Sequence, residues 1–146
     1  MNGEATRGGI GGMGLRSEVR APAIGVVVSN QGHQPAVEPE DLGRFFVERA
    51  NAGDVEALVA LYEPDAVLAF PPGQVVTGTQ AIRDAYTAFL AAGPTLAPGD
   101  PQPALRFGDL ALTSTRLDTG GATVEIARLQ PNGTWLWVID QPNVLG

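Results

Sequence analysis

The sequence predicts an α+β domain in which helices come first and an antiparallel sheet follows. Between roughly residues 39 and 92, apolar residues recur at the three- and four-residue spacing of a helix face. From about residue 103 onward the spacing changes to two, which is the period of a strand. Glycine and proline separate the segments. These patterns predict helices packed against a meander of strands.

We expect one domain and a tail within the 146 residues. Residues 1–37 are rich in glycine and form no apolar face, which predicts a disordered or loosely ordered tail, and residues 38–146 form the domain. Residues 21–28 (APAIGVVV) are the exception, since they suit an edge strand. Gly9, Gly11 and Gly14 spell G-x-G-x-x-G, but neither a strand nor an amphipathic helix flanks them, so we interpret them as a chance match.

Composition excludes several classes of function. The net charge is −7 and the nine basic residues are scattered arginines, which argues against nucleic acid as a partner. Cysteine is absent and His33 is the lone histidine, so we expect no cysteine nucleophile, and because the spacing shows no cluster of carboxylates, we expect no metal. Lysine is also absent, which excludes a Schiff base. No apolar run approaches the length of a bilayer span. We expect a cytoplasmic, bacterial, cofactor-independent protein that does not bind membranes.

Three helices are expected before residue 95. The first begins at Pro39 and ends at Gly53, where a positive φ is needed. Asp54 caps a second, short helix that ends with Tyr62 before Pro64. The third begins at Thr79 as its N-cap and closes at Gly93 and Pro94. Its apolar face consists of Ile82, Tyr86, Phe89 and Leu90.

Strands are predicted at 66–70 and then at about 103–108, 110–117, 122–130 and 134–141, with an Asn132–Gly133 hairpin turn before the last. The last strand is apolar on both faces, because Trp135, Trp137 and Ile139 alternate with Leu136 and Val138. One layer of helices covers only one face of a sheet. A second copy of the sheet is the simplest cover for the other face, so we expect a homodimer packed sheet to sheet.

Several short strings in this order resemble the nuclear-transport-factor-2-like superfamily, which includes SnoaL-like and ketosteroid isomerase-like proteins. They are Asn51-Ala52-Gly53-Asp54, the run from Ala60 to Leu68 (ALYEPDAVL), Thr77-Gly78 and Ala81-Ile82-Arg83, and the match spans about residues 40–142. The resemblance implies three helices packed on a strongly curved antiparallel sheet, forming a cone with an apolar internal cavity, often in a dimer. It implies no particular reaction, since the fold carries many functions.

The resemblance allows one reaction, that of the ketosteroid isomerases, to be checked residue by residue. Ketosteroid isomerases place an oxyanion-donating tyrosine where this chain has Phe46, and a general-base aspartate where it has Phe70. Their third acidic residue falls near Ala127. A phenyl ring neither accepts a proton nor donates to an enolate. We therefore expect that this chain does not carry out ketosteroid isomerase chemistry.

Three residues are candidates for catalysis: Asp140, Tyr62 and Asp65. Tyr62 either donates its hydroxyl into the cavity or is a core ring with its OH at the rim. Asp65 either faces the cavity or caps the turn after Pro64. Asp140 lies opposite in parity to both tryptophans and faces either the dimer side or the cavity mouth, depending on the phase of the strand.

The expected ligand-binding residues are aromatic or charged: Phe46, Phe70, Tyr86, Phe89, Arg116, Glu125 and Trp137. Arg116, Glu125 and Arg128 lie on neighbouring strands, where a cross-strand ion pair is the alternative to ligand contact. We expect a protein that binds a small hydrophobic organic molecule, and whether it is an enzyme stays open. Isomerisation, cyclisation or hydration are the candidate reactions. The alternative is a non-catalytic module for dimerisation or protein interaction.

Overall fold

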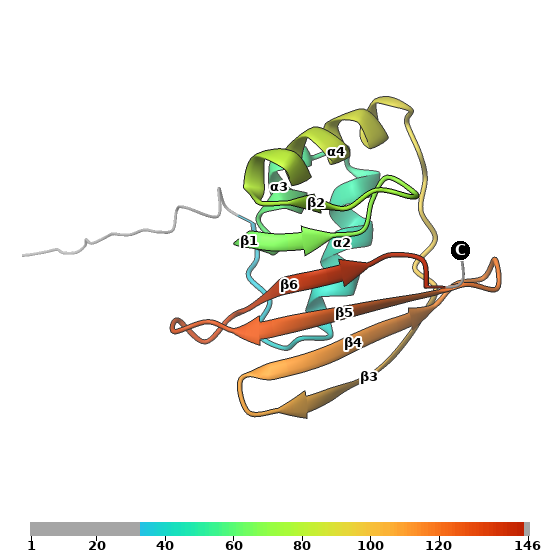
Figure 1. Ribbon diagram of the computed structural model, residues 1–146. Coiled ribbons are helices and arrows are strands. Elements are labelled where there is room, and N and C mark those ends of the chain that lie inside the picture. Colours follow the sequence, from blue (N-terminus) through green and yellow to red (C-terminus); the bar gives the residue numbers. More distant parts are fainter. Residues whose placement is uncertain (1–32, 145–146) are drawn as a thin grey trace, which may run out of the picture. The chain divides into compact units, whose positions relative to one another are not determined.

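The computed structural model describes residues 33–144 (Figure 1). The glycine motif, the predicted edge strand at 21–28 and most of the predicted tail lie outside the described residues. From Pro35 onward the chain forms one compact unit. Ala36, which the prediction assigns to the tail, is buried in the core, and its carbonyl accepts a hydrogen bond from the Trp135 backbone.

The described elements are an α+β set, as predicted. The helices are α2 (Asp41–Asn51), α3 (Val55–Val59) and α4 (Thr79–Ala91). The strands are β1 (Tyr62–Leu68), β2 (Val76–Thr77), β3 (Asp100–Phe107), β4 (Leu110–Arg116), β5 (Ala122–Leu129) and β6 (Trp135–Gln141). No helix among the described residues is long and apolar enough to span a membrane.

The helix ends differ from the prediction in three places. α2 begins at Asp41, with Glu40 as its N-cap, and not at Pro39. Asp54 caps α3 by accepting from the Ala57 backbone, but the helix ends at Val59, so Tyr62 begins β1 instead of ending the helix. Gly78 and not Thr79 is the N-cap of α4, because the chain enters this helix with φ of 92°. A glycine adopts this φ without the clash that a Cβ would cause.

The sheet has the strand order β2-β1-β6-β5-β4-β3 (Figure 1). The last four strands form the predicted antiparallel meander. The sheet is mainly antiparallel, as predicted, but one pairing departs from the prediction: β1 pairs parallel to β6, which makes the sheet mixed. Pro64 lies in the irregular stretch of β1 between Tyr62 and Val67, where its missing N–H interrupts no regular ladder.

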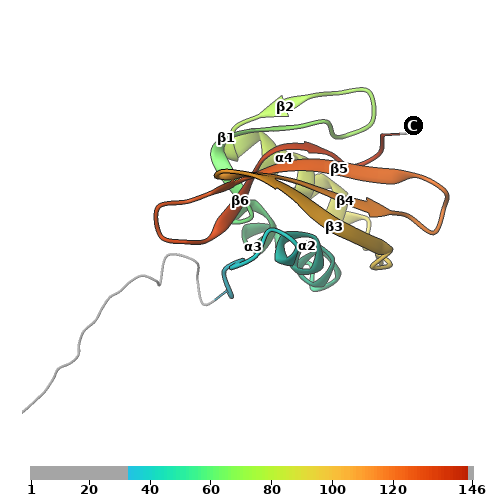
Figure 2. The same ribbon diagram turned by 90° about the horizontal axis from the view of Figure 1, so that it is seen from below.

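The core lies between the helices and one face of the sheet, and Figure 2 shows α2 and α3 on one side of the β3–β6 strands. Leu42, Leu58 and Ile82 from the helices are fully buried against this face. The opposite face carries an apolar row that the register aligns across four strands: Leu105, Leu112, Ile126 and Ile139. Leu105 is 68% exposed and Ile139 is 49% exposed, so no described helix covers this row.

Gly99, just before β3, allows the chain to pass close to β4. Its φ is +71°, and an added Cβ would lie 2.8 Å from both the Arg116 carbonyl oxygen and the Thr115 Cγ2. We expect Gly99→Ala to lower the free energy of unfolding by about 1–3 kcal/mol, measured by urea unfolding. Gly73→Ala is the matched control, since Gly73 has φ +82° but nothing within 4 Å of its Cβ position. An equal loss in both variants would show that the close approach contributes nothing.

Candidate functional site

A cavity of about 930 Å³ lies between the helices and the inner face of the sheet. Its walls come from α2, from α4, from the segment after β1, and from strands β4, β5 and β6. Most of the lining side chains are apolar. The buried polar side chains among them are Glu125 and Asp140, which are 6% and 4% exposed.

A bulge in β6 places Asp140 in this cavity. Ala127 pairs with Trp137 and Ile126 pairs with Ile139, so Val138 is an extra residue on β6. The extra residue turns Ile139 outward and brings Asp140 onto the same buried face as the tryptophans. The sequence interpretation, which assumed strict alternation, put Asp140 opposite the tryptophans and Ile139 beside them; both assignments are wrong for this reason.

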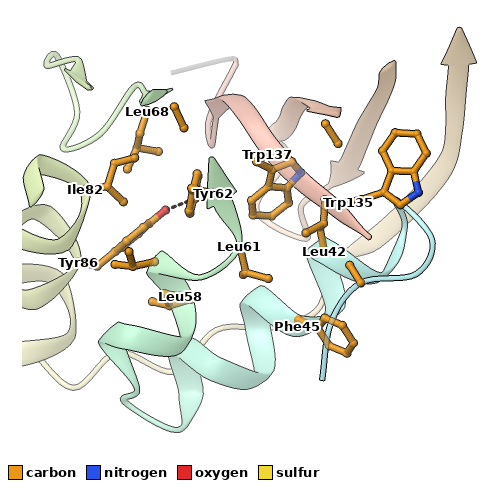
Figure 3. Packing of buried hydrophobic residues seen from close by; sticks show 14 of the residues in the cluster. Leu42, Phe45, Leu58, Leu61, Tyr62, Leu68, Ile82, Tyr86, Trp135 and Trp137 are labelled. Carbon is orange, nitrogen blue, oxygen red and sulfur yellow. Dashed lines mark hydrogen bonds between the residues drawn. The ribbon is translucent and has the colours of Figure 1, made fainter. Parts of the chain in front are cut away.

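Asp140 ends a short chain of hydrogen-bonded side chains. The Tyr62 hydroxyl donates to the Asp140 Oδ2 over 2.5 Å, and the Tyr62 and Tyr86 hydroxyl oxygens lie 2.6 Å apart. Figure 3 shows the Tyr86 ring reaching from α4 toward Tyr62 on β1. Tyr86 lines the cavity. The chain of hydroxyls therefore links the buried carboxyl group of Asp140 to a second point on the cavity wall.

Glu125 lies directly across from Asp140 in the β5–β6 ladder. The Thr113 hydroxyl donates to the Glu125 Oε1 over 2.6 Å, and the Trp137 indole N–H donates to the Thr113 oxygen over 3.3 Å. Side chains that face each other in this way have Cβ atoms about 5 Å apart. We call Asp140 and Glu125 the carboxyl pair.

Burial raises the pKa values of four side chains at this site: Asp140, Glu125, Tyr62 and Tyr86. Desolvation, with the charge of Glu125 as a smaller cause, raises the pKa of Asp140 to about 8, although the Tyr62 hydrogen bond opposes the rise. Desolvation also raises the pKa of Glu125, against the hydrogen bonds from Thr113 and Thr123. The pKa values of Tyr62 and Tyr86 are raised as well, again first by desolvation. Because the two carboxyl groups interact, the pair retains a proton into the neutral range.

Five aromatic side chains form one continuous surface of the cavity, which we call the aromatic wall: Phe46, Phe70, Tyr86, Phe89 and Trp137. The ring centroids of neighbouring members lie 5.3–6.1 Å apart, from Phe89 through Phe70, Tyr86 and Phe46 to Trp137. Such spacing is typical of packed aromatic pairs. The aromatic wall is an apolar surface that runs from α4 and α2 to Trp137, which lies on the same strand as Asp140.

The structure brings most of the predicted site residues together. Phe46, Phe70, Tyr86, Phe89, Glu125, Trp137 and Asp140 line the cavity, and Tyr62 contacts it through its bonds to Tyr86 and Asp140. Asp65 is exposed on β1 and lines no part of this cavity. Arg116 is 71% exposed and pairs with Asp100 over 3.8 Å instead of lining the cavity.

The alternative interpretation of the charged residues on β4 and β5 is corrected as well. Arg128 pairs with Glu63 over 3.0 Å, and Arg116 with Asp100, so neither forms an ion pair with Glu125. Glu125 instead accepts from Thr113. An Arg partner would have lowered the pKa of Glu125, whereas a threonine leaves burial as the dominant influence.

Sequence reasoning missed two features of the site. It treated Tyr86 only as an aromatic ligand contact, and nothing in the spacing of Tyr62 and Tyr86 indicates that their hydroxyls meet. It also missed the pairing of Thr113 with Glu125 and of Glu125 with Asp140. Counting outward from the hairpin turns would have found the first of these pairs, because β4 and β5 pair without a register shift.

The fold is a mixed sheet with helices on one face and, between them, a cavity that holds two buried carboxyl groups. The model of the SnoaL-like domain matches residues 43–140, and the chain belongs to this family. Solved structures labelled as nuclear-transport-factor-2-like share this fold, and together with the family match they agree with the sequence resemblance. No curated protein matches the chain.

Three solved structures illustrate the similarity. A ketosteroid isomerase-like protein from Erwinia carotovora atroseptica has TM-score 0.58 and 20% identity, over 69% of this chain and 88% of that one. A provisionally assigned dehydratase from Streptomyces avermitilis has TM-score 0.57 and 17% identity, over 72% and 93%. A provisionally assigned association domain of calcium/calmodulin-dependent protein kinase type II from Thiobacillus denitrificans has TM-score 0.62 and 14% identity, over 75% and 96%. At such identities the likeness shows the fold alone.

Proposed function

We propose that this domain binds a small, largely apolar organic molecule in the cavity and exchanges a proton with it through the carboxyl pair. The observation that carries the proposal is the burial of Asp140 and Glu125 side by side in the wall of an apolar cavity. An apolar cavity with a few convergent polar groups of shifted pKa is the usual form of a small-molecule site.

The energetic cost of the carboxyl pair supports this function. Burying a polar group without full hydrogen bonding costs on the order of 1–3 kcal/mol in proteins, and an apolar pair at these two positions would avoid that cost. Their hydrogen-bonding partners are neutral hydroxyl groups, which compensate a carboxylate charge less than an arginine does. The pair is therefore unfavourable for folding, as expected of groups retained for chemistry or recognition.

The shared proton determines which reactions suit the site. With one proton between them, one carboxyl group donates while its neighbour accepts, which is the requirement for isomerisation, cyclisation, or hydration and its reverse. The Tyr86 hydroxyl offers a further donor beside the bound molecule. These steps need only the side chains of the chain itself, so the proposal includes no cofactor. The names of two structural neighbours, an isomerase-like protein and a dehydratase, agree with this range of reactions.

Native mass spectrometry of the purified protein tests the binding step. We expect an added mass of a few hundred daltons, the size that such cavities enclose. The variant Ala69→Phe narrows the cavity, because Ala69 lines it, and should lose the added mass. If the added mass were absent from the wild type, or present in both the wild type and the variant, the result would contradict binding in this cavity.

Proton transfer is tested on the retained molecule in heavy water. Transfer to or from carbon leaves deuterium on the molecule, which mass spectrometry detects after extraction. We expect incorporation with the wild-type protein and a loss of at least about 100-fold with Asp140→Asn, since a positioned acid or base typically contributes that much. A retained molecule that gains no deuterium on carbon would leave the protein as a binder without catalysis.

A second candidate function is dimerisation or partner binding, which the apolar row on the outward face favours. Leu105 and Ile139 are exposed there although they align with the half-buried Leu112 and Ile126. The same native spectrum gives the number of subunits. We expect a homodimer, and we expect Leu105→Glu to convert it to a monomer. A wild-type monomer would contradict the sheet-to-sheet interface without affecting the ligand proposal.

A further inference from the structure

We propose that the polar end of the bound molecule is an organic cation, a protonated amine on a mostly apolar body, held by the carboxyl pair beside the aromatic wall. This inference rests on the proposed function, because it names the ligand class of the same cavity. It is carried by three observations: the balance of charge around the cavity, an oxygen of Asp140 without a donor, and the aromatic wall.

The charge balance of the cavity is negative. Its lining contains three acidic residues, Glu48, Glu125 and Asp140, and Arg44 is the basic one in the described lining. Arg44 is not available to the carboxyl pair, because its guanidinium donates to Asp41 over 2.7 Å and lies 3.9 Å from Glu48. A ligand anion would meet two buried acids with no opposing charge. A ligand cation would neutralise them.

Asp140 offers a free acceptor to such a ligand. Its Oδ2 accepts from Tyr62, whereas no described residue donates to its Oδ1, although the side chain is 4% exposed and lines the cavity. An ammonium group has three donors and no acceptor, so it bonds carboxylate oxygens without competing for the Tyr62 hydroxyl. A hydrogen bond between two ionised groups is about twice as strong as one between neutral groups.

The aromatic wall suits the rest of a cationic ligand. Aromatic rings attract a nearby cation through the negative charge of their faces, and the attraction grows when water is excluded. The same rings provide apolar contact for the body of the molecule. Trp137 and Tyr86 are 3% exposed, so water has little access to this part of the wall. The wall and the carboxyl pair thus favour the same class of ligand.

Binding of a cation changes the protonation of the pair, with a definite sign. The groups that face Asp140 are Glu125 from β5, Tyr62 from β1 and Tyr86 from α4, while Arg44 and Glu48 from α2 lie at the exposed part of the lining. The raised pKa of Asp140 means that its proton is present at neutral pH. An ammonium group favours the ionised form of Asp140, so its binding releases a proton and strengthens as the pH rises toward about 8. With such a ligand bound, the carboxyl pair acts as the proton acceptor and the Tyr86 hydroxyl as the donor.

Calorimetric titration with three matched probes tests the inference. Naphthylmethylamine is cationic, naphthylmethanol is neutral and polar, and ethylnaphthalene is apolar; all three have nearly the same shape. We expect the amine to bind at least about tenfold more tightly than either neutral probe, as a charged hydrogen bond commonly provides. Titrations in two buffers of different ionisation enthalpy should show proton release for the amine and none for ethylnaphthalene.

Variants distinguish amine binding by the carboxyl pair from a general attraction of the amine to surface charge. Asp140→Asn should lower the affinity for the amine at least about tenfold and abolish the proton release on amine binding, while the affinity for ethylnaphthalene stays the same. Asp65→Asn is the matched control, because Asp65 is exposed and lines no part of the cavity, and this change should alter the affinity for the amine by no more than about threefold. Equal affinity of the amine and a neutral probe would overturn the cation inference and leave the proposed function standing. Failure of all three probes to bind would count against both.

Discussion

The free energy of unfolding is expected to fall as the pH rises from about 5 to about 8. Asp140 has a folded-state pKa of about 8, raised mainly by burial, whereas an unfolded aspartate has a pKa near about 3.9. Between these values the folded protein binds more protons than the unfolded chain, so stability decreases with pH by up to about 1.4 kcal/mol per unit. The raised pKa of Glu125 acts in the same direction. This is the reverse of the usual behaviour of ion-paired carboxylates.

Urea unfolding across this pH range measures the slope. Asp140→Asn removes the titrating group and should at least halve the slope, and its stability should exceed that of the wild type at the upper end of the range. Asp65→Asn is the matched control, because Asp65 is exposed, and its slope should equal that of the wild type. A slope of zero, or stability that rises with pH, would show that Asp140 is not held in its neutral form.

Replacement of Tyr62 by phenylalanine is expected to have the second-largest effect. The variant keeps the buried ring but removes the hydroxyl that bonds both Asp140 and Tyr86. A buried acceptor left without its donor costs about 1–3 kcal/mol. The pKa of Asp140 should also rise further, since the Tyr62 hydrogen bond now lowers it. Urea unfolding and carbon NMR of the labelled carboxyl group measure the two effects.

Tyr86→Phe serves as the matched control for this variant. The Tyr86 hydroxyl is hydrogen-bonded to Tyr62 but not to Asp140. Its removal should therefore reduce the free energy of unfolding less than the Tyr62 change does, and Asp140 Oδ2 should keep Tyr62 as its donor. If the pKa of Asp140 rose equally in both variants, the pairwise contact with Tyr62 would not be its cause. If neither variant lost stability, water would be replacing the hydroxyls, and the hydrogen-bonded chain would contribute little to folding.

The sequence predicted the secondary structure of the meander well. β4, β5 and β6 begin and end close to the predicted limits, because alternation and the Asn132–Gly133 turn are local signals. The positive φ of Gly53 just after α2 and the Asp54 cap of α3 were also predictable, since each depends on one residue and its neighbours. Prediction was less accurate around Tyr62, where a short helix passes directly into a strand.

Tertiary structure alone decided how the site is assembled. The sequence identified Asp140, Glu125, Tyr62 and Tyr86 as separate candidates, but it could not place Val138 as a bulged residue, because a bulge depends on the partner strand β5. The parallel pairing of β1 with β6 likewise depends on contacts between distant parts of the chain, and it brings Tyr62 beside Asp140. The residue types and local elements were therefore determined by sequence, whereas strand register, burial and the resulting pKa of Asp140 arise from long-range packing that no local pattern encodes.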